Sequence, residues 1–180
     1  MMHDRKIPVW DIVTRIFHWS LVLAFCLSQL TAEEWDTAHE YAGYIILGLI
    51  GFRIIWGFVG PENVRFCKFV TSPSTLKAHL IRLLTGEHVA DSGHNPAGGV
   101  MVILLLVWLT LTGLTGWLSI TISGNFAEIL EKLHQFLGEF SWLLVGAHIG
   151  GVIVMSFIER QDLASSMVDG KKHLITKSLD

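Results

Sequence analysis

The chain has 180 residues, of which 51% are hydrophobic and only 16% are charged, and it contains two cysteines. Its mean hydropathy is +0.51, and soluble proteins carry about a quarter charged residues, so the composition excludes an ordinary soluble domain. The net charge of −3 says little about partners, and the lack of a basic stripe argues against a nucleic-acid partner. Cys26 and Cys67 have no metal-binding spacing, and a C-x-x-C-H motif for covalent haem attachment is absent from the sequence.

Four apolar runs follow one another along the chain, each close to the length of about 17 to 25 residues that a helix needs to cross a bilayer. They cover residues 12–32, 41–59, 97–122 and 136–158. The sequence therefore predicts an all-α integral membrane protein over residues 1–160, built as a four-transmembrane-helix bundle. A polar cytoplasmic tail is expected at 161–180.

The connection between the second and third runs, residues 60–96, contains its own helix signal. Ser72 is a candidate N-cap and Pro73 a candidate first helical residue. Four leucines then recur at helical spacing: Leu76, Leu80, Leu83 and Leu84. This pattern predicts a short helix that either lies on the membrane surface or packs on the bundle.

The distribution of charge predicts the orientation of the spans. Of the 13 lysines and arginines, only Lys132 lies on the side opposite the termini, so the positive-inside rule places both termini and the 60–96 connection in the cytoplasm. The opposite, outer side carries mostly carboxylates: Glu33, Glu34, Asp36, Glu40, Glu128 and Glu131.

Four histidines lie at matching depths in these spans. His18 lies near the cytoplasmic start of the first span, and His39 lies at the outer start of the second. His134 lies at the outer start of the fourth span, and His148 follows fourteen residues later, which is about 21 Å along a helix and nearly the same helix face. Depth therefore sorts the histidines into an outer pair, His39 with His134, and a cytoplasmic pair, His18 with His148.

Two facing imidazoles at one level are the ligands of a six-coordinate haem iron, and the cores of helix bundles hold such sites. A transition metal without a porphyrin would need more ligands, and carboxylates and cysteines are lacking at these depths. The pattern predicts two haems. Glycines on three spans either leave room beside the ligands or serve close helix packing: Gly43, Gly48, Gly51, Gly113, Gly116, Gly146, Gly150 and Gly151.

Four longer segments, three of which contain these histidines, carry a resemblance to a known family: VWDIVTRIFHWSLVL, HEYAGYIILGLIGFRIIWGFVG, GHNPAGG and LHQFLGEFSWLLVGAHIGGV. They resemble the bacterial cytochrome b561 and nickel–iron hydrogenase cytochrome b subunit family, over nearly the whole chain to about residue 160. The resemblance implies two haem b groups and electron transfer to or from a quinone. It also implies haem ligation by His18, His39, His134 and His148.

Two arginines are candidates for holding haem propionates. Arg53 lies on the second span, fourteen residues after His39, where a cation needs a partner or a path to the interface. A propionate would satisfy it with paired hydrogen bonds, and snorkelling to the cytoplasmic interface is the alternative reading. Arg15 lies next to His18 in depth and is the second candidate.

The segment GHNPAGG opens the third span on the cytoplasmic side. Asn95 and Pro96 form a helix start signal there. His94 can hydrogen-bond a quinone carbonyl and move protons near neutral pH. His94 and Asn95 are therefore the candidates for a quinone site.

The expected function is that of a di-haem b-type cytochrome in the respiratory chain of a bacterial inner membrane. It would move electrons between a quinone and an external redox protein, either a c-type cytochrome or a hydrogenase. Hydrogenase cytochromes b are usually longer, and an acidic outer face suits a positively charged c-type cytochrome. Two alternatives remain: a superoxide oxidase that reduces quinone, and a haem-free membrane scaffold or transporter.

Overall fold

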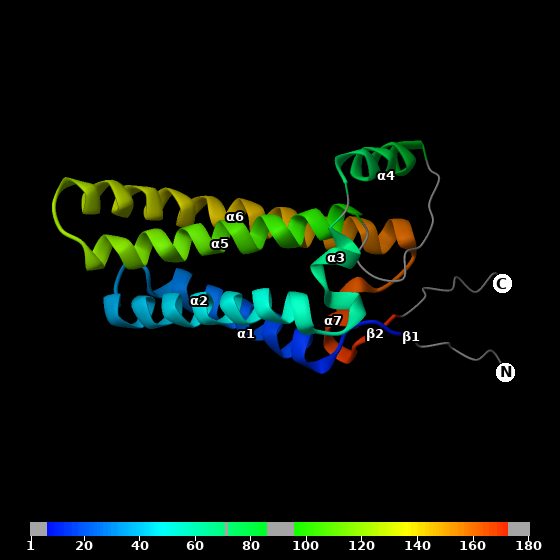
Figure 1. Cartoon of the computed structure of the whole chain (residues 1–180), viewed down its shortest axis with the longest axis horizontal. Helices are drawn as coiled ribbons and strands as arrows, with labels where there is room; N and C mark the ends of the chain where they lie inside the picture. Colours follow the sequence, from blue (N-terminus) through cyan, green and yellow to red (C-terminus); the bar gives the residue numbers. More distant parts are fainter. Residues whose placement is uncertain (1–6, 71, 86–95, 173–180) are drawn as a thin grey trace. The chain divides into compact units, whose positions relative to one another are not determined.

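A computed structural model of the chain describes residues 7–70, 72–85 and 96–172. Most of this part is helical (Figure 1). The long helices are α1, Ile12–Thr31; α2, Asp36–Val59; α5, Pro96–Thr121; and α6, Asn125–Glu159. The shorter elements are β1, Ile7–Pro8; η1, Glu62–Val64; α3, Phe66–Phe69; α4, Pro73–Thr85; α7, Leu163–Asp169; and β2, Lys171–Lys172.

The four long helices are each long and apolar enough to cross a membrane, so the number of candidate spans equals the number predicted. Large apolar side chains are exposed on them: Leu23 is 72% exposed, Leu143 61% and Phe157 77%. Water would make such a surface costly, whereas lipid solvates it without that cost. The exposed apolar faces therefore fit helices surrounded by lipid.

Two of the long helices begin earlier than the apolar runs that predicted them. α6 begins at Asn125, whereas its apolar run begins at Phe136, and α2 begins at Asp36 rather than at Tyr41. The additional turns carry charged side chains such as Glu128. Hydropathy reports which part of a helix lies in lipid, and a helix continues into the headgroup region when its backbone hydrogen bonds allow it.

The chain divides into two compact units. The first unit comprises residues 1–15, 57–101 and 147–180, and the second unit comprises residues 16–56 and 102–146. The second unit therefore contains parts of all four long helices. The predicted outer histidine pair falls entirely within it.

The core of the second unit is formed by side chains on one face of each helix. On α2, Ala42, Ile46 and Ile50 recur every four residues and are 0%, 6% and 2% exposed, which is the spacing of a single buried face. Trp108 joins α5 to α6, because its indole N–H donates to the Leu137 carbonyl at 3.0 Å. This packing fixes which way the side chains of each helix point.

In the first unit, the two-residue strands β1 and β2 pair in the antiparallel direction (Figure 1). The Val9 N–H donates to the Gly170 carbonyl at 2.8 Å. α7 is capped by Asp162, whose carboxylate accepts the Ser165 N–H at 2.9 Å, and it ends at Gly170 with a φ of 78°. The described part of the segment expected as a polar tail, 161–180, thus folds into a helix and a strand that bind the N-terminal segment.

α4 begins at the predicted residue, Pro73. The predicted cap is also present, because the Ser72 hydroxyl accepts the Thr75 N–H at 3.2 Å. Lys77 is exposed and Ile81 is 50% exposed, a combination typical of a helix at a lipid–water boundary. Its placement on the membrane surface remains a prediction.

Candidate functional site

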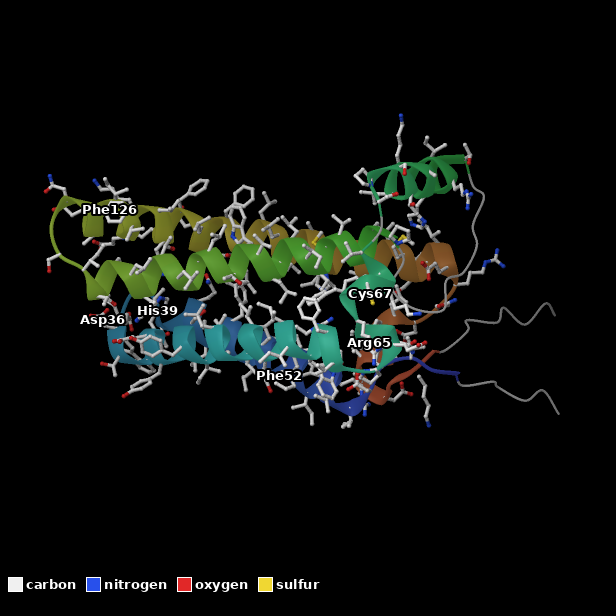
Figure 2. The ribbon with its side chains drawn as sticks, in the orientation of Figure 1. Asp36, His39, Phe52, Arg65, Cys67 and Phe126 are labelled. Atoms are coloured by element: carbon white, nitrogen blue, oxygen red, sulfur yellow. The ribbon has the colours of Figure 1, made fainter. Side chains whose placement is uncertain are left out.

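His39 of α2 and His134 of α6 face each other within the second unit. Their ring centroids are 5.8 Å apart, with an angle of 76° between the ring planes. Figure 2 shows His39 near the start of α2. A metal–imidazole bond is about 2 Å long, so two ligand nitrogens on opposite sides of one ion lie about 4 Å apart and their ring centres lie farther apart. The observed spacing is compatible with one metal ion between the two rings.

A backbone carbonyl orients each of these rings. Nδ1 of His39 lies 2.8 Å from the Ser28 carbonyl oxygen of α1, and Nδ1 of His134 lies 2.8 Å from the Thr112 carbonyl oxygen of α5. A carbonyl oxygen only accepts hydrogen bonds, so Nδ1 is the donor in both rings. This orientation leaves Nε2 as the ring nitrogen through which each histidine can bind a metal.

Gly116 of α5 allows the His134 ring to lie against the helix backbone. A Cβ atom at Gly116 would lie 2.8 Å from both Cε1 and Nδ1 of that ring, which is far inside the optimal contact distance of about 3.5 to 4.0 Å. At Gly113 a Cβ would instead lie 2.7 Å from Cδ2 of Leu47, so this glycine serves helix packing. At the other predicted positions a Cβ would meet no atom within 4 Å: Gly43, Gly48, Gly51, Gly146, Gly150 and Gly151.

The donors at the His39–His134 pair suit an iron porphyrin better than a bare ion. Among the described residues, no group of three or more His, Cys, Asp or Glu side chains is arranged to hold a metal. Two imidazoles alone leave a transition metal with too few ligands. A porphyrin would supply the other ligands itself, and His39 and His134 would hold its iron.

The predicted cytoplasmic pair, His18 with His148, remains a prediction. His18 belongs to the second unit, and its ring lies edge-to-face with Trp19 at a centroid distance of 5.2 Å. His148 belongs to the first unit, and both histidines are half-buried. α6 is continuous from His134 to His148, so their separation along the helix is about 21 Å, as the sequence predicts.

The other predicted site residues differ in their surroundings. Arg53 is only 3% exposed, and a cation buried to this degree favours a partner inside the protein over snorkelling along the lipid face. Arg15 donates through Nη1 to the Val168 carbonyl at 2.5 Å, so it links α1 to α7. His94 and Asn95 lie outside the described residues.

The end of the second unit that holds His39 and His134 is acidic. Figure 2 shows Asp36 at the same end of α2 as His39. An open hollow of about 560 Å³ lies there, lined by Glu34, Trp35, Asp36, Thr37, Ala38 and Tyr41. The predicted outer carboxylates are all exposed: Glu33, Glu34, Asp36, Glu40, Glu128 and Glu131. Such a surface is complementary to a positively charged partner.

The fold and the paired imidazoles define a class, a multi-pass membrane protein whose helix bundle is suited to axial ligation of a haem. The family model described as prokaryotic cytochrome b561 matches residues 9–170, and the chain belongs to this family. The resemblance seen in the sequence is thereby confirmed, and membership makes the protein a membrane b-type cytochrome of electron transfer. No curated protein and no solved structure matches the chain.

Proposed function

We propose that the protein is a di-haem cytochrome that moves electrons across a bacterial inner membrane, between a quinone and an external redox protein. The observation that carries the proposal is the His39–His134 pair, in which two backbone carbonyls select the tautomer that leaves Nε2 of both rings able to bind iron. Haem, when bound, supplies one-electron chemistry through its iron. The chain orients the histidine ligands, and its apolar helices exclude water from the haem site.

The second haem of this proposal is held by His18 and His148. Support comes from their matching depth in the spans, their half-buried side chains and the continuity of α6 between His134 and His148. One helix would then carry a ligand for each haem, about 21 Å apart along its axis. Two redox centres stacked in this way give an electron a path across the bilayer.

The external partner in this proposal is a protein with a positive docking surface, such as a c-type cytochrome. The support is the exposed acidic end beside His39 and His134, in which Glu34 and Asp36 line the hollow. In the described part of the chain, none of these carboxylates forms an ion pair, so their charge is available to a partner. An anion such as superoxide would be repelled by the same surface. On the cytoplasmic side, His94 and Asn95 are the proposed quinone contacts.

Electron delivery to the purified protein in liposomes tests this function. A quinol added without oxygen should produce the absorption bands of reduced b-type haem, and an oxidised basic c-type cytochrome added outside should remove them. Rapid reduction by superoxide, with quinone as the acceptor and no reaction with the c-type cytochrome, would assign the superoxide oxidase activity instead. Absence of b-type bands in the purified chain would leave a membrane scaffold or transporter.

Arg53 provides a prediction about one haem potential. A buried cation stabilises the reduced, less positive state of a nearby haem, so Arg53→Leu should lower the potential of the haem at His18 and His148. The measurement is a potentiometric series of visible spectra, with Arg53→Lys as the charge-retaining control. An unchanged potential in Arg53→Leu would show that Arg53 only anchors α2.

A further inference from the structure

The two carbonyls that orient the histidines share one more feature. Each accepts a hydrogen bond from the hydroxyl of a threonine three residues later in the same helix. On α1, Oγ1 of Thr31 lies 3.3 Å from the Ser28 carbonyl oxygen. On α5, Oγ1 of Thr115 lies 2.9 Å from the Thr112 carbonyl oxygen. In both His39 and His134, the carbonyl that orients the ring therefore also accepts a hydrogen bond from a threonine hydroxyl.

Both threonines are buried, at 2% exposed for Thr31 and 7% for Thr115. Each hydroxyl also lies 2.8 Å from the carbonyl four residues earlier, that of Leu27 or Leu111. That second contact is the ordinary one for threonine in a helix and would satisfy the hydroxyl by itself. Because a hydroxyl has one proton to donate, the contact three residues back shares that proton in a three-centre hydrogen bond, and it falls on the histidine's acceptor in both cases.

The other threonines of α5 lack this contact three residues back, although the Ser119 hydroxyl on the same helix donates to the Gly116 carbonyl at 2.8 Å. The hydroxyl of Thr110 donates to the Leu106 carbonyl at 2.6 Å, and that of Thr121 donates to the Trp117 carbonyl at 2.6 Å. Both acceptors lie four residues back, and neither orients a histidine. Thr110 is therefore a matched control on the same helix.

We propose that Thr31 and Thr115 are positioning residues that raise the redox potential of the haem bound by His39 and His134. The inference rests on the proposed function, because it requires haem at this pair. A carbonyl oxygen has two lone pairs. For Thr112, which lies inside α5, the amide four residues later already uses part of this capacity. The threonine hydroxyl uses part of the remaining lone-pair capacity of the carbonyl oxygen. The carbonyl therefore accepts a weaker hydrogen bond from Nδ1–H of the histidine.

The strength of the hydrogen bond that Nδ1–H donates to the carbonyl controls how strongly Nε2 donates electrons to a metal. A strong bond makes the imidazole more basic and stabilises ferric iron, whereas a weakened bond favours ferrous iron and a higher potential. Thr115 lies 2.9 Å from its carbonyl and Thr31 lies 3.3 Å from its own. Thr115 should therefore have the larger effect.

The test is the midpoint potential of this haem in Thr115→Val, which keeps the side-chain shape and removes the donor. The ratio of reduced to oxidised haem at a fixed ambient potential should fall about threefold, or about 28 mV for one electron at 59 mV per tenfold. Thr31→Val should shift the potential less, in the same direction. Thr115→Ser and the control Thr110→Val should leave it unchanged.

An unchanged or raised potential in Thr115→Val, with both haems bound, would overturn the inference. If Thr115→Val is purified without haem, the comparison passes to Thr115→Ala and Thr115→Ser, and equal potentials in these two variants would overturn it as well. Failure of the proposed function gives a different result, namely wild-type protein without b-type bands or a His134→Ala variant that keeps both haems.

Discussion

Replacing His134 with alanine is expected to reduce the haem content from two per chain to one. Each iron depends on its own pair of imidazoles, so loss of one ligand removes one haem and leaves the other pair intact. His39→Ala should remove the same haem, whereas His18→Ala and His148→Ala should each remove the other. The measurement is haem per purified chain, together with the electron paramagnetic resonance signals of the two ferric haems.

His79 offers a matched control for these substitutions. It is a half-buried histidine of α4 to which the proposal gives no ligand role, so His79→Ala should keep both haems and both signals. Loss of one and the same signal in His134→Ala and His148→Ala would show that the pairing by depth is wrong.

Neutralising the acidic end should slow electron exchange with a basic c-type cytochrome. The variant combines Glu33→Gln, Glu34→Gln and Asp36→Asn. Because charge steers the encounter of oppositely charged proteins, the rate at low salt should fall by about tenfold. Its dependence on salt should also flatten, since screening then has less attraction to remove.

Stopped-flow oxidation of the reduced protein across a salt series measures this effect. Glu62→Gln, on the predicted cytoplasmic side, serves as the control and should leave the exchange with the c-type cytochrome unchanged. Reduction by quinol should be the same in all three proteins. A wild-type rate that rises with salt would speak against a basic protein partner and for a small-molecule donor.

Hydropathy predicted the four long helices, because the length and apolar character of a span are properties of the sequence itself. The helix α6 begins before the fourth apolar run, since residues 125–135 include charged side chains and are helical outside that run. The pairing of β1 with β2 was also missed, because a two-residue ladder between distant segments has no periodicity. The N-cap residue Asp162 and the C-cap residue Gly170 could have predicted the two ends of α7 from the sequence.

The histidine pair His39–His134 was predictable from depth and helix direction alone. Its supporting contacts were not, because Ser28 and Thr112 act through their backbone carbonyls, which every residue has. Gly116 was expected either to leave room beside a ligand or to serve helix packing, and the structure shows that the His134 ring lies against it. Thr115 could have been suspected only after Thr112 was known to contact His134.

The central claim is that this chain holds two haems, each between two histidines. The most direct measurement is the haem-to-protein ratio of the purified wild-type chain, combined with its reduced-minus-oxidised visible spectrum. Two haems per chain and bands of the b type only are expected. A ratio of one would contradict the second pair, and a chain that shows no b-type band when produced with haem available would contradict the whole account.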